Sequence, residues 1–334
     1  MHEATAAKRT YLDQFPAFRG TDPEEVRNDL SRAYGAQILD SHLDADGFRA
    51  IGNHVQLQSV GLSYCSFGAP VQVHFPAANF VRQQFQLRGY GATAIGNKKV
   101  AVKPDQSCVI SEQTDVVVDF CQSFEQLVLR VDAHTLQRKL TALIGSKPAS
   151  PLQFESSANL NDRNVENLRQ LTLHFANLLS ATRVGLPRLV MEELQQSIVM
   201  AFICCNRHNF SQLLDEEPKE SAPWQVKRVE DYIEARWSSP ITIEKLTTIT
   251  NTSARSIFKA FKNSREYTPM EFAKQVRLKH ARAMFLLPQS NTAVSGVALA
   301  CGFSNLGHFA KDYRQAFGEL PSVTLSRGRR VNPL

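Results

Sequence analysis

The hydrophobic pattern is strand-like over residues 36–130. Short apolar runs, in which apolar and polar residues alternate, are separated by turn-forming residues such as those at 68–70 and 103–105. The runs are Phe48–Val60, Gly61–Phe67, Val71–Phe75, Phe80–Leu87, Val100–Val102, Cys108–Ser111, Val116–Phe120 and Leu127–Val131. Many short strands joined by tight turns predict a small β-barrel or jelly roll.

A helical period follows the predicted strands. Helices are expected at about Asp22–Ala33, Ala133–Ile144, Val165–Ser180 and Pro187–Leu214, where apolar residues recur three and four apart. Within the last, Leu194, Ile198 and Phe202 form an apolar stripe that fits an internal core or a contact between two copies equally well. Residues 215–223 are polar and contain two prolines, which predicts a linker.

The last third of the chain repeats one pattern of short helices and tight turns. In the first copy, Asn251 makes the turn and Ser253 caps the helix Ala254–Ser264. In the second, 51 residues further on, Gly302 makes the turn and Ser304 caps the helix starting at residue 305. A helix from Pro269 to Leu287 joins the two copies. This spacing predicts two helix-turn-helix units whose second helices enter successive major grooves, roughly 34 Å apart.

The helical period also predicts which residues of the two second helices face outward to DNA. On the first helix these are Arg255, Ser256, Phe258, Lys259 and Lys262, and on the second they are Asn305, Leu306, Gly307, His308, Lys311 and Arg314. Arg255 and Lys259 lie one turn apart and suit base reading, whereas Arg314 is expected on phosphate.

The charge distribution agrees with this interpretation. The net charge of the chain is +6, but residues 221–334 hold 17 Lys and Arg against 8 Asp and Glu. The remaining 220 residues hold 21 basic and 24 acidic side chains. A basic excess confined to one domain fits a phosphate backbone better than a general role in solubility.

The second unit, VALACGFSNLGHFAKDYRQAFGELPSVTL, and the first, SARSIFKAFKNSREYTPMEFAKQVRLKHARAMFL, resemble the AraC/XylS family of bacterial transcription regulators. The motif elements present are Ala298, Gly302, Phe303, Phe309, Tyr313, Phe317, Gly318, Pro321 and Ser322. The wording of the motif looks most like the XylS-type branch, whose members often activate catabolic operons in response to aromatic carboxylates. Family members commonly carry Ser where Gly307 stands, so a hydroxyl contact to DNA is absent here.

The resemblance implies an α+β chain with three parts. Residues 1–214 would form a cupin-like β-barrel with a helical dimerisation segment, 215–223 a linker, and 224–334 an all-α domain with two helix-turn-helix units. The implied protein is a cytoplasmic homodimer that binds double-stranded promoter DNA, contacts RNA polymerase and responds to a small-molecule effector.

Strand residues that could face a barrel lumen include Arg49, Arg82, Gln84 and Arg88. This arginine-rich face is either exposed to solvent or binds an anionic effector, because guanidinium groups match carboxylate and phosphate. An aromatic acid would need one arginine and an apolar wall. A cyclic dinucleotide would need two or more arginines and a site open to the surface.

Other classes of function find less support. The N-terminus lacks a secretory pattern and no run approaches the roughly 18 apolar residues of a membrane helix. The six cysteines form no metal-binding pattern, and His54 and His74 lack the partner of a cupin metal site, so we expect no metal or other cofactor. A repair methyltransferase would need a nucleophilic Cys in a Pro-Cys-His context, which is absent. A ligand-independent DNA-binding dimer stays open as an alternative.

Overall fold

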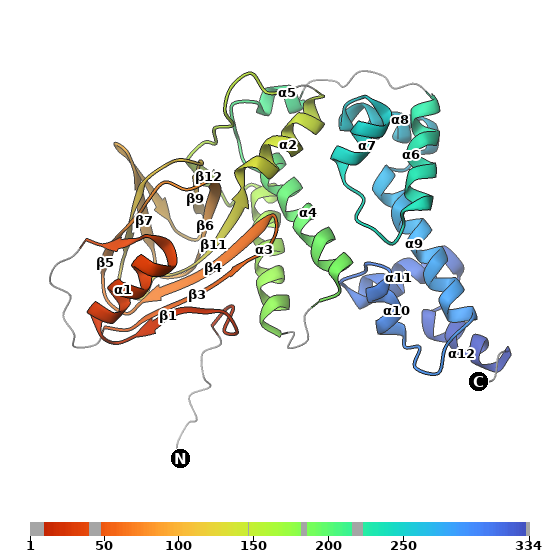
Figure 1. Ribbon diagram of the computed structural model, residues 1–334, viewed down its shortest axis with the longest axis horizontal. Helices are drawn as coiled ribbons and strands as arrows, with labels where there is room; N and C mark the ends of the chain where they lie inside the picture. The colour runs from red at the N-terminus through yellow and green to blue at the C-terminus, as the bar shows by residue number, and fades with distance from the viewer. Residues whose placement is uncertain (1–9, 40–47, 146, 182–185, 216–222, 332–334) are drawn as a thin grey trace, which may run out of the picture. The chain divides into compact units, whose positions relative to one another are not determined.

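The computed structural model describes residues 10–39, 48–145, 147–181, 186–215 and 223–331. These residues form two compact units (Figure 1). The sheet unit comprises the described residues of 1–137, 149–184 and 198–212, and the helical unit those of 138–148, 185–197 and 213–334. The boundary falls inside helices α2 (Ala133–Ile144) and α4 (Arg188–Cys205), so each helix contributes residues to both units.

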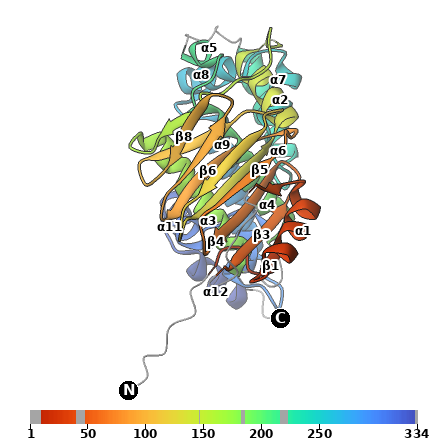
Figure 2. The same cartoon turned by 90° about the vertical axis from the view of Figure 1, so that its left-hand side faces the viewer.

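The strands of the sheet unit form two antiparallel sheets (Figure 2). The seven-stranded sheet has the order β1-β3-β4-β11-β6-β9-β12, and the five-stranded sheet the order β2-β5-β10-β7-β8. The strands are β1 (Pro16–Gly20), β2 (Gln37–Ile38), β3 (Ala50–Gln56), β4 (Val60–Phe67), β5 (Val71–Phe75), β6 (Phe80–Arg88), β7 (Gly91–Ile95), β8 (Lys98–Val102), β9 (Gln106–Ile110), β10 (Val116–Phe120), β11 (Glu125–Asp132) and β12 (Ser157–Asn159). The barrel or jelly-roll prediction is confirmed in its antiparallel, two-sheet form.

The core of the sheet unit lies between the two sheets. Phe67 from the larger sheet packs against Phe120 from the smaller one, with ring centroids 4.6 Å apart, and both side chains are buried. Gly52 on β3 lies directly beneath the ring of Phe18, because a Cβ atom there would come within 2.0 Å of the ring. The alternating pattern of the sequence therefore places one face of each sheet in this common core.

Helices of the sheet unit start and end where local chemistry predicts. Helix α1 (Pro23–Tyr34) is capped by Asp22 and ends at Gly35, whose φ of 61° is left-handed. Helix α3 (Arg163–Ala181) matches the predicted Val165–Ser180. The predicted helix 187–214 is wrong, since it consists of α4 and a separate α5 (Ser211–Asp215). The break follows Cys205, because the side-chain amide of Asn206 donates to Gln83 Oε1 on strand β6, at 2.9 Å.

The apolar stripe on α4 belongs to the interior of the chain. Ile198 and Phe202 are fully buried and Leu194 is 9% exposed. Of the two interpretations that the pattern allowed, the internal core is the one that the structure supports. A dimer contact through these three side chains would require them to leave their present neighbours.

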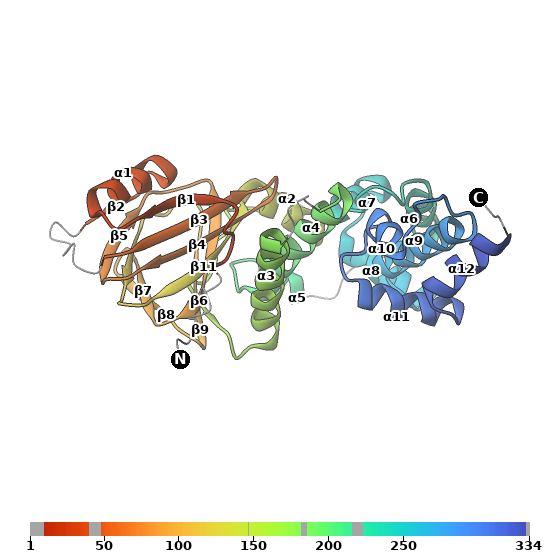
Figure 3. The same ribbon diagram turned by 90° about the horizontal axis from the view of Figure 1, so that it is seen from below.

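The helical unit contains two small cores joined by one helix (Figure 3). Helix α9 contributes Phe272, Ala273 and Val276 to the first core and Leu278, Ala281 and Phe285 to the second. The helices that follow α5 in the helical unit are α6 (Pro223–Ala235), α7 (Ile243–Thr250), α8 (Ala254–Arg265), α9 (Pro269–Leu286), α10 (Val294–Ala300), α11 (Leu306–Phe317) and α12 (Pro321–Val331). Because both cores include side chains from this one helix, α9 fixes the spacing of the two helix-turn-helix units.

The turns of both units show the predicted backbone. Asn251 has a φ of 52° and Gly302 a φ of 85°, both left-handed, and Ser253 caps α8 by accepting from the Ser256 amide. The predicted cap Ser304 is wrong. Asn305 caps α11 instead, because its side-chain oxygen accepts from the His308 amide at 2.9 Å.

Two further expectations concern the parts outside these cores. Most of the predicted linker, residues 216–222, lies outside the described residues. Within the described part of the chain, no helix combines the length and apolar character needed to cross a lipid bilayer.

Candidate functional sites

A cavity of about 40 Å³ lies between the two sheets and helix α1. Its walls are mainly apolar, with Phe18, Tyr34, Phe67 and Phe75 among the aromatic side chains. The polar side chains that line it are Ser63, Arg82, Gln84, Gln126 and Arg130. Such a mixture of an apolar wall and a few polar groups is typical of a small-molecule site.

Arg82 and Arg130 are the charged groups of this cavity, and they lie opposite each other on the paired strands β6 and β11. Arg82 is 8% exposed, and its Nη2 donates to the Thr114 carbonyl oxygen at 3.0 Å. The guanidinium carbon of Arg130 lies 4.9 Å from the ring centroids of both Tyr34 and Phe80. These cation–π contacts hold the two cations without neutralising them.

Neither arginine has a carboxylate partner among the described residues. No ion pair involves Arg82 or Arg130 there, and the buried Nε of Arg130 has no hydrogen-bond acceptor. Burial lowers the pKa of Arg82 to about 10, with Arg130 contributing, and burial also lowers the pKa of Arg130. Because arginine keeps its proton in proteins at neutral pH, the cavity holds two positive charges that form no ion pair with the described residues, an arrangement that favours an anion.

The structure brings two of the four predicted effector residues into this cavity. Arg82 and Gln84 line it, and the Gln84 side-chain oxygen accepts from the Thr93 hydroxyl at 2.6 Å. Arg49 is exposed in a different surface hollow, together with Asp13 and Arg19. Arg88 is exposed too, 3.7 Å from a Glu125 oxygen. The prediction that Arg49 and Arg88 face the lumen is therefore wrong.

A register shift explains the error at Arg88. Glu125 pairs with Arg88 and Gln126 with Gln86, so Leu87 is an extra residue in β6 and the alternation that places Arg82 inside does not continue to Arg88. Sequence reasoning also missed Arg130. The alternating residues Gln126, Val128 and Arg130 could have indicated it, because Arg130 is the one charged residue among these three. The strand that carries them pairs with a neighbour on both sides.

The two helix-turn-helix units present their second helices to different degrees. On α11 the side chains of Asn305, Leu306, His308, Lys311 and Arg314 are exposed, as is Gly307. Of the residues predicted to face DNA on α8, Lys262 is exposed, whereas Arg255, Phe258 and Lys259 are half-buried. Ser256 is 1% exposed, and its hydroxyl accepts from that of Ser253 at 3.0 Å. The prediction that Ser256 faces outward is wrong.

The N-terminal end of α8 is covered by other parts of the helical unit. Arg255 Nη1 donates to the Leu213 carbonyl oxygen of α5 at 2.7 Å. A Cβ atom on Gly145, just after α2, would lie 2.9 Å from Ser253 Cβ, so this glycine permits a close approach. Arg255, which the sequence predicts to contact bases in the first unit, is thus already hydrogen-bonded to the main chain.

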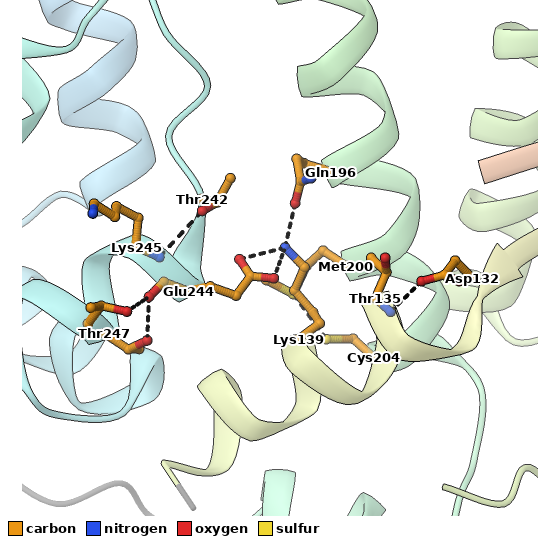
Figure 4. Close-up of polar contacts among 11 residues, drawn as sticks. Asp132, Thr135, Lys139, Gln196, Met200, Cys204, Thr242, Glu244, Lys245 and Thr247 are labelled. Atoms are coloured by element: carbon orange, nitrogen blue, oxygen red, sulfur yellow. Dashed lines mark hydrogen bonds and ion pairs between the residues drawn. The ribbon is translucent and has the colours of Figure 1, made fainter. Parts of the chain in front are cut away.

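A buried lysine ties α2 and α4 to the first helix-turn-helix unit (Figure 4). Lys139 on α2 is 1% exposed; its Nζ donates to Gln196 Oε1 on α4 at 2.7 Å and lies 3.3 Å from the Glu244 carboxylate on α7. A second link joins Glu193 on α4 to Arg277 on α9, at 2.7 Å. Here, unlike in the cavity, each buried cation has a carboxylate.

Comparisons with known proteins agree with both halves of this description. Residues 26–204 match the family model of the AraC-binding-like domain, and residues 246–327 match that of a helix-turn-helix domain. The chain belongs to the AraC/XylS family of transcription regulators, with a cupin-like domain followed by a helix-turn-helix DNA-binding domain.

The chain is also similar to individual proteins. The XylDLEGF operon transcriptional activator 3 of Pseudomonas putida is 26% identical over 320 residues, covering 93% of this chain and 92% of that protein. The probable thc operon regulatory protein of Rhodococcus erythropolis is 26% identical over 244 residues, covering 72% and 73%. A crystal structure of a probable AraC family transcriptional regulator from Rhodopseudomonas palustris is 60% identical and covers 31% of this chain and 96% of that one, with a TM-score of 0.31.

Proposed function

We propose that this protein is a transcription activator whose DNA binding is controlled by a small anionic effector, such as an aromatic carboxylate, held in the cavity of the sheet unit. The observation that carries the proposal is the pair of buried Arg82 and half-buried Arg130, for which the described residues supply no carboxylate partner. A guanidinium can donate two parallel hydrogen bonds to a carboxylate, which would neutralise this charge. The aromatic walls would then pack against a ring.

The size of the cavity bears on the alternatives. A volume of about 40 Å³ holds a few water molecules or the head group of a small acid, and a ring requires the aromatic walls to shift. A cyclic dinucleotide, with two phosphates and two bases, is far larger, so this candidate is disfavoured. A ligand-independent dimer would leave the two cations of the cavity without a role.

On DNA, we propose that α8 and α11 read adjacent major grooves of a promoter from one face of the duplex. Arg255, Lys259, His308 and Lys311 would contact bases, and Lys262 and Arg314 the phosphate backbone. Phe258 and Leu306 would meet thymine methyl groups, and Asn305 and Gly307 would allow a close approach of the helix start. We further propose that it acts in the cytoplasm as a homodimer, contacts RNA polymerase and carries out no catalysis.

The test combines effector binding with footprinting of the full-length protein. Thermal shift against benzoate and a cyclic dinucleotide should show stabilisation by the acid alone, because ligand binding to the folded state raises its stability. Footprinting on a selected operator should show two protected major grooves per monomer, with protection that changes when the acid is added. One protected groove per monomer would contradict the two-helix docking, and stabilisation by neither ligand would contradict the effector.

A further inference from the structure

Strand β11 presents two unsatisfied polar groups to the same cavity. Gln126, Val128 and Arg130 line it at period two. The side-chain oxygen of Gln126 and the Nε of Arg130 are both buried, and the described residues give neither a hydrogen-bond partner. Buried polar groups in folded proteins are almost always paired, so two exceptions in one cavity of about 40 Å³ call for a shared explanation.

The two groups have opposite requirements. Arg130 is a donor that lacks an acceptor. Gln126 is 2% exposed, and its Nε2 already donates to the Cys65 sulfur at 3.3 Å. Burial raises the pKa of the Cys65 thiol to about 11, so the sulfur stays a neutral thiol at neutral pH. The amide oxygen of Gln126 has no donor among the described residues, and an unpaired buried acceptor destabilises the folded state.

Other polar groups of the cavity do not supply that donor. The Gln84 side-chain oxygen accepts from Thr93, and the Ser63 hydroxyl lies 2.9 Å from the His54 ring. Val128 stands between Gln126 and Arg130 on the strand and offers only apolar surface. A ligand that contacts both ends would thus bear an acceptor at one end, a donor at the other and an apolar body between them.

We propose that the effector is a small acid that also carries a hydroxyl or amino group away from its carboxylate, with the carboxylate on Arg130 and the second group donating to Gln126. This rests on the proposed function, since it names the chemistry of the same effector. Gln126 is a specificity-determining residue in this scheme. It discriminates because a ligand without the donor leaves the amide oxygen unpaired.

The experiment is isothermal titration calorimetry of the full-length protein with benzoate, 3-hydroxybenzoate, 4-hydroxybenzoate, 3-methoxybenzoate and 3-hydroxybenzamide. At least one hydroxybenzoate should bind about tenfold more tightly than benzoate, because it pairs a buried acceptor. The methoxy acid should bind no better than benzoate, since it has no proton to donate. The neutral amide should bind more weakly than its acid, since it cannot neutralise Arg130.

Variants locate the two contacts. Gln126→Met keeps the length of the side chain but removes the acceptor, so the ratio of hydroxybenzoate to benzoate affinity should fall to about one. Arg130→Met should remove the preference for acid over amide. Arg88→Gln, an exposed arginine outside the cavity, is the matched control and should change neither ratio.

The outcomes separate this proposal from the one on which it rests. If no acid of the series binds, the proposed effector class fails and this inference with it. If benzoate and both hydroxybenzoates bind equally, the anionic effector stands and the role of Gln126 is overturned. Tighter binding of the methoxy acid than of the hydroxy acids would also overturn it. The ligand series on the unaltered protein decides these outcomes even if a variant does not fold.

Discussion

The sheet unit and the helical unit both use arginine and lysine, but in opposite surroundings. In the cavity, Arg82 is buried, Arg130 is half-buried with a buried Nε, and neither has a carboxylate partner in the described part of the chain. On α11, Lys311 and Arg314 are exposed. A buried cation is costly unless an anion reaches it, which selects one small, well-shaped anion. An exposed cation is solvated and screened, which suits a polyanion bound through many weak contacts.

Lys139 shows a third kind of surroundings for a cation. Lys139 is as buried as Arg82, but it has the Glu244 carboxylate beside it. Its charge is therefore compensated within the chain, and it needs no ligand. The comparison shows that burial alone does not mark a binding site; burial without a partner does.

Salt gives the largest expected contrast between the two regions. Raising the NaCl concentration from 50 to 200 mM should weaken operator binding by about 10³-fold if some six phosphates are neutralised. Effector affinity should change by less than about threefold, because a buried pair is little screened. Fluorescence anisotropy with labelled operator and calorimetry with the effector measure the two. An equal salt dependence would remove the distinction between the regions.

The buried lysine offers the next largest effect. Glu244→Ala should lower the free energy of unfolding by about 3 kcal/mol, because it leaves Lys139 buried without its carboxylate. Lys139→Met should cost less, since Glu244 is partly exposed and water can solvate it. Urea unfolding measures both, and Lys227→Met, an exposed lysine paired with Asp231, is the control. A larger loss for Lys139→Met would contradict this order.

The two recognition helices can be compared by substitution. Arg255→Ala should cost about 1–3 kcal/mol on the selected operator and little on random DNA, whereas Arg314→Ala should weaken both and reduce the salt slope by about one. Arg228→Ala on α6, also exposed, is the control. Anisotropy titrations provide the measurement. If Arg255 keeps its bond to Leu213 on DNA, its substitution will leave operator affinity unchanged.

The smallest effect concerns His54, next to the cavity. Burial, with help from Arg130, lowers the pKa of His54 from 6.5 to about 4. The unfolded state therefore binds the proton more readily, and stability should fall as the pH drops from about 6.5 to about 4. The ring is only half-buried, so we expect a loss of about 1 kcal/mol after screening by solvent. Urea melts at pH 7 and pH 4.5 test this, and His54→Gln should flatten the dependence.

The sequence determined most of the helical unit by itself. Its helices are short and amphipathic, and the turn residues Asn251 and Gly302 and the cap Ser253 act on their immediate neighbours. Local chemistry of this kind can be predicted from spacing alone. The cap of α11 was misplaced, at Ser304 instead of Asn305, because two good capping residues stand side by side.

Exposure on the recognition helices was decided by the tertiary structure. The helical period of the sequence predicts which face of α8 points away from its own core. It does not predict that α5 and the end of α2 cover the start of α8. Ser256 is buried and Arg255 is hydrogen-bonded for this reason. Both contacts join residues more than 40 positions apart, and no local pattern records them.

The cavity depended on tertiary structure most of all. The alternation of β6 predicted Arg82 and Gln84 inside, but a bulge at Leu87 in β6 itself turned Arg88 outward, and Arg49 came to lie at a separate hollow. Arg130 enters only because β11 pairs with β4 and β6 at one register. The sequence shows in which strands apolar and polar residues alternate. Which strands become neighbours, and hence which charges meet in one cavity, depends on pairing between distant segments, and that pairing is a property of the folded chain.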